Sequence, residues 1–420
     1  MNPVLHWIWL SLACTPGSYT FGKLIEVYKD ATEIYEADAK RIASVIGYKN
    51  SDRTKLEDKD LEQAEKIFAF CNKFKVDILT YADSRYPEAL RRISNPPVLL
   101  YCRGVVPDFN SSLCVATVGT RSLSDYGRKN GFKISFDLAK AGATIVSGMA
   151  IGIDAVCMAG ALAAGGRVVS VIGSGIDVCY PPQHLTLARS IVKQGCVITE
   201  FAPGTQPSRY NFPKRNRIIS GLCDATLVVE GEERSGALIT ARCAKEQERE
   251  VFAVPGNIAS PNSQLSNLLI KNGAKICTRA EDILNLYIKK YPGKINLFAL
   301  TQTTPVDMMS ALREYEICAV CPNDDIFIPS HGSTHRQSPK TEADKPIVES
   351  TEKAEVTPPT DFDKKSLKIY KKIPANEACS LESLVDDDMN LREVMSHLLK
   401  LEIGGFVRLL PGEMVTRKFK

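Results

Sequence analysis

The sequence lacks most of the features that mark nucleotide-dependent and hydrolytic enzymes. It contains no Walker A motif, the glycine-rich loop and lysine that many proteins use to bind ATP. The turns "GTRSLS" and "GSGIDV" do not complete the three-glycine fingerprint of dinucleotide-binding enzymes. Only five histidines occur in 420 residues, and just His184 falls among the alternating strands and helices, beside "CYPPQ", where it suits a turn. These absences leave no evident nucleophile, general base or hydride-transfer site.

The chain also lacks a long hydrophobic run, a large net charge and a regular cysteine framework. The stretch "HWIWLSLAC" is too short to cross a bilayer and has no basic segment before it, so we predict a core helix and no membrane association. A net charge of +4 requires any nucleic-acid contact to be a local patch. The 13 cysteines follow no disulfide spacing, which favours buried thiols in the reducing cytoplasm.

The length of 420 residues predicts more than one domain, and the composition changes along the chain suggest four regions. Residues 1–75 carry helical periodicity and form a small helical, SAM-like domain. Residues 76–288 alternate strands and helices. Residues 289–365 are rich in Pro, Thr, Ser, Lys and Glu and are expected to be a disordered linker. Residues 366–420 show three helical stretches and a hairpin, the layout of a winged-helix domain.

The middle region predicts an α/β fold. Its short apolar runs are "LCVATV", "ATIVSG", "RVVSVIG", "CVITE", "ATLVVEG", "EVFAVPG" and "AKIC", each followed by a helical segment or a turn. Continuous apolar strands separated by helices are typical of a parallel sheet covered on both faces. We therefore expect a parallel α/β sheet domain, with its ligand at the carboxyl ends of the strands.

Glycine-rich loops follow these strands. They contain Gly119, Gly148, Gly173, Gly175, Gly236 and Gly256. Glycine lets a ligand approach the backbone closely, and the helix start behind each turn offers free N–H groups, so the loops suit phosphate. Each single glycine also has a purely geometric explanation. Arg121 directly follows Gly119 and is expected to lie over the same cleft.

The most basic stretch is "NFPKRNRIISG", which contains Lys214, Arg215 and Arg217. The nearest acids are Glu200 and Asp224, so we expect these cations to lack a local partner and to bind an anion. Tyr210 and Phe212 add aromatic rings, and cations interleaved with aromatics suit single-stranded nucleic acid. The open alternative is a charged helix face balanced by distant acids, with Glu200 pairing with the arginines and Asp154 bracing a loop.

A further pattern concerns metal. Cys318 and Cys321 are spaced as C-x-x-C, and His331 and His335 follow as H-x3-H, which are pair spacings of zinc ligands. The gap between the two pairs is shorter than in the usual zinc finger, and no strong helix precedes the histidines. We predict neither a metal nor a cofactor and leave zinc as an open alternative.

Six motifs together resemble a known family. The stretches "VGTRSLSDYG", "SGMAIGIDA", "IGSGIDVCYP", "NFPKRNRIISG", "SGALITAR" and "EVFAVPG", in this order, are similar to the DNA-processing protein A family of bacteria, also called Smf. The resemblance covers roughly residues 80–285 and extends more weakly to both ends. It implies an extended Rossmann-like domain in a homodimeric, non-enzymatic protein. Such a protein binds single-stranded DNA, protects incoming DNA during natural transformation in competent cells, and helps load the RecA recombinase.

The resemblance also assigns binding residues. The family's G-S/T-R motif falls on Gly119, Thr120 and Arg121, and its F-P-x-R-N-R motif falls on residues 212–217. The predicted DNA-binding residues are Gly119, Thr120, Arg121, Ser147, Gly148, Gly173, Gly175, Phe212, Lys214, Arg215, Asn216, Arg217, Ser235 and Gly236. The chain departs from the family at Ile151, where Arg is usual, in "VCMAGAL", where a His is usual, and near Gln264, where a Gly is common.

A second function stays open from the residues alone. A nucleoside-monophosphate phosphoribohydrolase on a related α/β fold would use the glycine loops for one phosphate and a carboxylate such as Glu200 for hydrolysis. The two hypotheses differ in the extent of the basic surface, because a nucleotide needs one phosphate pocket whereas a strand needs cations at several loops.

Overall fold

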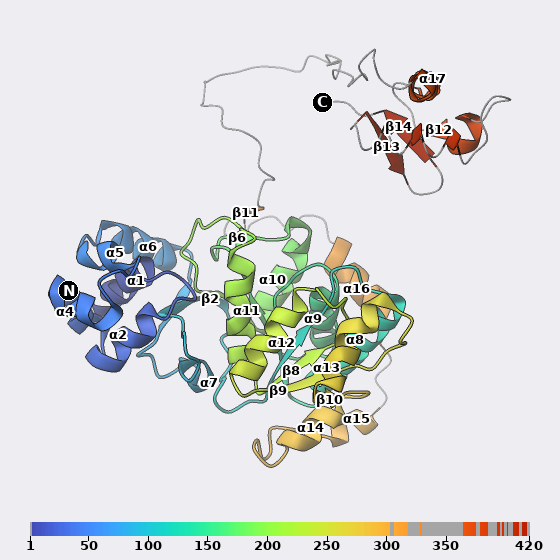
Figure 1. Ribbon diagram of the computed structural model, residues 1–420. Coiled ribbons are helices and arrows are strands. Elements are labelled where there is room, and N and C mark those ends of the chain that lie inside the picture. The colour runs from blue at the N-terminus through green and yellow to red at the C-terminus, as the bar shows by residue number, and fades with distance from the viewer. Residues whose placement is uncertain are drawn as a thin grey trace, which may run out of the picture. The chain divides into compact units, whose positions relative to one another are not determined.

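The computed structural model describes residues 2–302, 306–317, 328–329, 364–374, 379–384, 393–394, 397–398, 401, 406–410 and 414–417. The chain divides into two compact units, Met1–Thr334 and His335–Lys420 (Figure 1). The four residues with zinc-like spacing, Cys318, Cys321, His331 and His335, lie outside the described residues. Within the described part of the chain, no helix is both long and apolar enough to cross a bilayer.

The first unit begins with six helices. They are α1 (Pro3–Ala13), α2 (Thr20–Tyr28), α3 (Ala31–Glu36), α4 (Ala39–Ile46), α5 (Arg53–Glu57) and α6 (Glu62–Lys73). Helix α1 is capped by Asn2, whose side chain accepts from the Val4 backbone N–H, and it buries Trp7 and Trp9. The predicted core helix is therefore confirmed. These helices pack into the same hydrophobic cluster as one face of the sheet that follows.

The sheet has nine strands in the order β1-β2-β7-β5-β4-β3-β8-β9-β10. They are β1 (Asp77–Thr80), β2 (Leu99–Gly104), β3 (Cys114–Val118), β4 (Thr144–Ser147), β5 (Val168–Val171), β7 (Cys196–Thr199), β8 (Ala225–Val228), β9 (Glu250–Ala253) and β10 (Lys275–Ile276). The seven predicted strands, β3 to β5 and β7 to β10, pair in parallel. The sequence analysis missed β1 and β2, which form an antiparallel edge beside β7.

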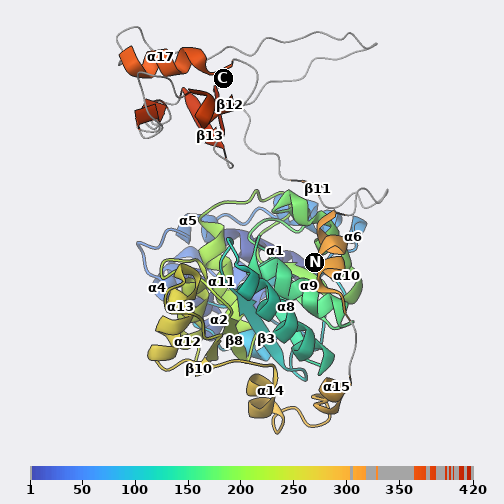
Figure 2. The ribbon, with the colours of Figure 1, turned by 90° about the vertical axis from the view of Figure 1, so that its right-hand side faces the viewer.

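Helices cover both faces of this sheet, as Figure 2 shows. One face carries α8 (Asp125–Lys140), α9 (Ile153–Ala163) and α10 (Leu185–Gln194), and the other carries α7 (Glu88–Arg91), α11 (Asn211–Gly221), α12 (Ala237–Glu246) and α13 (Gln264–Lys271). The chain moves outward from β3 in one direction and from β8 in the other, so the order reverses between these two strands. Such a switch point opens a crevice at the carboxyl ends of the strands.

The predicted linker at 289–365 begins too early. Helix α14 (Glu281–Tyr287) is followed by α15 (Phe298–Thr301) and α16 (Met308–Ile317), and α16 packs on α9 and α10. It buries Ala311, Leu312 and Tyr315, which share one face of the helix. Residues up to 317 therefore belong to the first unit. Beyond them, Ile328–Pro329 (β11) pairs in parallel with Val178–Cys179 (β6).

The second unit contains α17 (Lys364–Lys372), a 3-10 turn at Leu381–Leu384 and a small sheet of three strands. The strands β12 (Cys379–Ser380), β14 (Met414–Arg417) and β13 (Val407–Leu410) pair antiparallel in that order. Its described core consists of Ile369, Tyr370, Ile373, Leu384, Val394, Leu398, Leu401, Val407 and Val415. The winged-helix assignment stays a prediction.

Candidate nucleic-acid interface

Two adjoining cavities lie where the strand order reverses. A large cleft, open to solvent, runs from the loop after β3 to the start of α12. A smaller pocket adjoins it. The two cavities share the residues Arg121, Ala150, Tyr180, Phe212 and Arg215. The predicted location of the ligand at this edge of the sheet therefore coincides with a cleft.

Aromatic rings and an arginine form the border between the cavities. The rings of Tyr180 and Phe212 stack with centroids 5.6 Å apart and planes 28° apart. The guanidinium of Arg121 lies 5.8 Å from the centroid of Phe212, and Arg121 itself is exposed. A Cβ at Gly173 would lie 3.1 Å from the Phe212 ring, so this glycine makes room for the ring. The border presents aromatic faces beside a cation.

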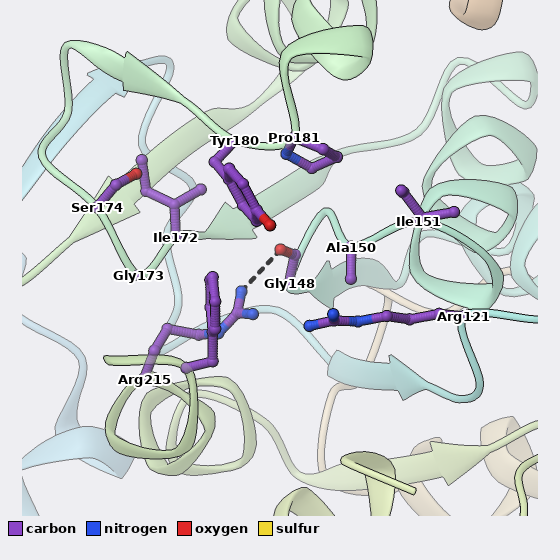
Figure 3. Close-up of a pocket in the computed structure, with 11 residues that line it drawn as sticks. Arg121, Gly148, Ala150, Ile151, Ile172, Gly173, Ser174, Tyr180, Pro181 and Arg215 are labelled. Atoms are coloured by element: carbon purple, nitrogen blue, oxygen red, sulfur yellow. Dashed lines mark hydrogen bonds between the residues drawn. The ribbon is translucent and has the colours of Figure 1, made fainter. Parts of the chain in front are cut away.

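Arg215 lies at the base of the pocket (Figure 3). Its side chain is 5% exposed, and its Nη1 donates to the backbone carbonyls of Gly148, at 2.7 Å, and Val171. Its Nε has no hydrogen-bond partner among the described residues. Burial lowers the pKa of Arg215 to about 10, although the nearby Asp154 carboxylate opposes this shift. A buried cation that is only partly paired favours an incoming anion.

Carboxylates of the protein itself accept hydrogen bonds at two of the glycine-rich loops. Asp154 Oδ2 accepts from the Gly148 N–H at 3.1 Å, which confirms its loop-bracing role. At the start of α8, the buried Glu230 carboxylate accepts from the N–H and the hydroxyl of Ser124, both at 2.7 Å. The N–H groups expected to bind phosphate are therefore already hydrogen-bonded at these two loops. Anion contacts are left chiefly to the arginine side chains.

The glycines in these loops are needed for close packing. A Cβ added to Gly119 would lie 2.6 Å from Cγ1 of Ile153, and one added to Gly148 would lie 2.4 Å from Nη1 of Arg215. Both distances are too short for carbon in contact with these atoms. The geometric explanation of the glycines, which the sequence analysis left open, accounts for these two positions.

Helix α11 divides the basic cluster between two surfaces. Phe212, Arg215 and Asn216 line the cleft. Arg217 points elsewhere, and its Nη2 forms an ion pair with Glu200 Oε2 at 2.5 Å, with both side chains 6% exposed. The expectation that the cluster has no local partner is therefore wrong for Arg217, and the alternative of a Glu200 pair is confirmed. Lys214 does not line the cleft either, because it lies against Gly17.

The other predicted residues also divide between surface and interior. Gly119, Thr120, Ser235 and Gly236 line the cleft, and Gly148 and Gly173 line the pocket. Ser147 and Gly175 are buried and line neither cavity, and the Ser147 hydroxyl donates to the Thr117 carbonyl at 2.6 Å. These two residues belong to the interior beneath the loops.

Three residues that line these cavities, Tyr180, Arg209 and Arg234, were not predicted from the sequence, and Ile151, noted only as a departure from the family, lines the pocket too. Arg209 directly precedes Tyr210, with its guanidinium 4.9 Å from that ring centroid, so the cation–aromatic pattern extends one step further upstream. Arg234 is hidden in "EGEERSG", where three glutamates mask its charge. Ile151 lies where the family usually has Arg, and it makes this wall of the pocket apolar.

Two residues that the sequence offered as candidates for chemistry, Glu200 and His184, are hydrogen-bonded within the protein. Glu200 lines neither of the two cavities. His184 is buried, and its Nδ1 lies 2.9 Å from the Met149 carbonyl, in keeping with a role in the turn. The described residues include no group of three His, Cys, Asp or Glu side chains arranged to hold a metal ion.

Comparisons with known proteins agree with the resemblance noted in the sequence. The Smf protein of Escherichia coli K12 is 42% identical over 236 residues, which cover 53% of this chain and 63% of that protein. The DNA processing protein DprA of Bacillus subtilis is 38% identical over 218 residues, which cover 52% of this chain and 73% of that protein. The chain thus matches less than two thirds of the Escherichia coli protein.

A solved structure and a family sequence model both indicate the same protein family. The X-ray structure of DNA processing protein A from Streptococcus pneumoniae superposes with a TM-score of 0.58 at 34% identity, over 68% of this chain and 98% of that one. The sequence model described as DNA recombination-mediator protein A matches residues 77–288, the span of the nine-stranded sheet and its helices. The chain therefore belongs to the DNA recombination-mediator protein A family.

Proposed function

We propose that this protein binds single-stranded DNA in the cleft and acts as a recombination mediator. The observation that carries the proposal is the set of arginines and aromatic rings along one cleft: Arg121 and Arg209 with the stacked rings of Tyr180 and Phe212. Single strands are bound in this way in general, with phosphates on cations and bases stacked on rings. Arg215 adds a buried cation within the pocket.

The lining of the cleft favours a single strand over a duplex. Between the arginines it presents the apolar or small residues Pro207, Pro213, Ile219, Ala237 and Ile239. Such a floor accepts exposed bases, which a duplex keeps stacked in its interior. A duplex would offer the cleft only its phosphates and groove edges.

The biological role that we propose requires the protein to bind single-stranded DNA without catalysing a reaction on it. The protein would hold and protect incoming single strands in the cytoplasm during natural transformation and pass them to the RecA recombinase. The relatives from Bacillus subtilis and Streptococcus pneumoniae, named DNA processing proteins, support this role. We propose no cofactor, no metal, and a non-enzymatic function. The phosphoribohydrolase alternative is disfavoured because Glu200, its candidate carboxylate, is paired with Arg217 outside the cleft.

Binding of labelled oligonucleotides at increasing salt tests the proposal. Arg121, Arg209, Arg215 and Arg234 line the cleft, so a strand that contacts three or four of them should show a log–log salt slope of about −2 to −3. A duplex of equal length should bind more weakly at every salt concentration. A flat salt dependence, or equal affinity for duplex and single strand, would contradict the proposal.

We also propose that the protein is a homodimer that uses the β10 edge of the sheet. This strand ends the sheet order, and its Ile276 is 53% exposed, with Leu286 of α14 also exposed nearby in sequence. An unpaired edge strand with exposed apolar side chains is a ready surface for a second chain.

The change Ile276→Lys should convert the dimer to a monomer, because it places a charge in the apolar contact. Light scattering coupled to size-exclusion chromatography measures the mass directly. Val27→Lys is the matched control, since Val27 on α2 is also 53% exposed but lies far from this edge in the fold. A dimer that persists in Ile276→Lys would place the contact on another face.

A further inference from the structure

Helix α11 lies between the proposed DNA cleft and the N-terminal helices. One face of the helix presents Phe212, Arg215 and Ile219 toward the cleft cavities, at a spacing of three to four residues. The opposite face presents Lys214 and Arg217, which lie against the turn at Gly17 between α1 and α2. Any shift of α11 therefore moves both surfaces together.

The contact on the second face is a buried ion pair beside a small cavity. Glu200 directly follows β7, and its Oε2 binds Nη2 of Arg217. A small cavity lies beside Glu200, lined by residues 14–18 of the N-terminal turn and by residues 96–99, which lead into β2. Glu200 Oε1 and the Nε and Nη1 atoms of Arg217 have no hydrogen-bond partner among the described residues. The ion pair is thus supported by few other hydrogen bonds from its surroundings.

Two further hydrogen bonds connect the surroundings of the Glu200–Arg217 pair to neighbouring elements. The Asn95 side-chain amide donates to the Gly17 carbonyl at 3.1 Å, which ties the N-terminal turn to the loop before β2. On the other side, the Gln247 side-chain amide donates to the Arg217 carbonyl at 2.9 Å, which ties α11 to the end of α12. Arg217 is therefore held through its side chain on one side and its backbone on the other.

We propose that the Glu200–Arg217 pair is a positioning device that holds α11 in its orientation at the end of β7, beside the N-terminal turn, and so sets the affinity of the cleft for a strand. This inference rests on the proposed function. A buried ion pair adds little net stability, because desolvation offsets its attraction, but its directional hydrogen bond fixes orientation. Without the pair, the side chain of Arg217 no longer fixes the orientation of α11, and Phe212 and Arg215 shift from the geometry in which they line the pocket.

The test uses the full chain with Glu200 and Arg217 both changed to leucine. This double variant leaves no unpaired buried charge, and Glu200→Gln, which keeps the shape and an acceptor oxygen, is the milder companion. We expect both to stay folded and to keep the wild-type salt slope. The double variant should bind a single strand at least fivefold more weakly, and Glu200→Gln should show a smaller loss. Amide hydrogen exchange without DNA should become faster across residues 212–217.

The Arg53–Glu57 ion pair, which lies on α5 away from α11, provides the control. Changing the exposed pair Arg53 and Glu57 to glutamine should leave affinity and exchange unaltered. Unchanged affinity and exchange in the folded variants would overturn the inference, and so would a slope shallower by about 0.7, which would make Arg217 a direct phosphate contact. If the wild-type protein binds no single strand, the proposed function fails, whereas the exchange of α11 still decides whether the pair positions the helix.

Discussion

Replacing Arg121 with alanine should weaken binding of a single strand by roughly 10- to 100-fold. Arg121 is exposed and lines both the cleft and the pocket, with its guanidinium over the Phe212 ring. A hydrogen bond to a charged partner contributes about 1.5–3 kcal/mol, which sets this range. Because one phosphate contact is lost, the log–log salt slope should become shallower by about 0.7. Titration of the variant with a labelled oligonucleotide at several salt concentrations measures both quantities.

Arg128→Ala is the matched control for Arg121→Ala. Arg128 is an arginine on α8 outside the cleft, where it pairs with Asp125. Its removal lowers the net charge by the same amount and should leave the affinity almost unchanged. The loss in Arg121→Ala should also be equal for different base sequences, because phosphate contacts carry no sequence information. A normal slope in Arg121→Ala would show that this residue does not contact phosphate.

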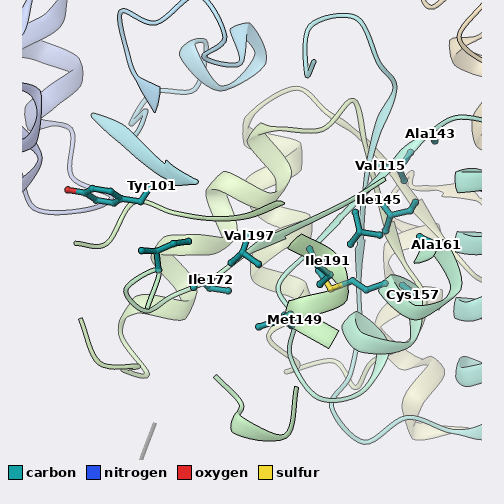
Figure 4. Packing of buried hydrophobic residues seen from close by; sticks show 14 of the residues in the cluster. Tyr101, Val115, Ala143, Ile145, Met149, Cys157, Ala161, Ile172, Ile191 and Val197 are labelled. Atoms are coloured by element: carbon teal, nitrogen blue, oxygen red, sulfur yellow. The ribbon is translucent and has the colours of Figure 1, made fainter. Parts of the chain in front are cut away.

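The sheet could be predicted because its central strands are buried on both faces. Val115, Ile145 and Val197 come from three of these strands and pack in one layer with Ile191 of α10 (Figure 4). A strand of this kind must be apolar throughout, and the helices between the runs then imply parallel pairing. The run "VLLYC" in β2 is equally apolar, but no helical pattern as long as those between the other strands leads to it. A short apolar run alone does not distinguish a strand from a buried helix segment.

The sequence predicts which stretch of the chain contributes to the candidate site, but it does not predict which side chains of that stretch reach the cleft. The motif residues 212–217 specify which side chains α11 carries, whereas the neighbours of the helix decide which of them reach the cleft. The partner of Arg217, Glu200, lies 17 residues earlier in the chain and becomes adjacent only because β7 ends beside α11. Charge spacing therefore predicted a stretch of chain that does line a cleft, but not that Lys214 and Arg217 point away from it.

For a similar reason, the sequence could not show that N–H groups at two of the glycine-rich loops are already hydrogen-bonded to carboxylates. Glu230 and Ser124 are 106 residues apart in the chain, yet their side chains meet at the start of α8. Nothing in the local sequence of the loop indicates that its N–H groups have an internal acceptor. A glycine-rich turn before a helix predicts an anion site only when the fold leaves the turn empty.

Replacing Phe212 with alanine should weaken single-strand binding by about 5- to 100-fold, since stacking of one base on an aromatic ring contributes about 1–3 kcal/mol. The ring stacks on Tyr180 and lies beneath Arg121, so its removal takes away the aromatic face at the border of the two cavities.

Unlike Arg121→Ala, Phe212→Ala should keep the wild-type salt slope, because no charge is lost. Phe212→Tyr should retain most of the affinity, and Phe298→Ala, which removes an exposed phenylalanine on α15, should have no effect. Fluorescence titrations of the three variants at two salt concentrations separate these effects. Full affinity in Phe212→Ala would mean that the ring only braces the loop, and the strand would then be held by its phosphates alone.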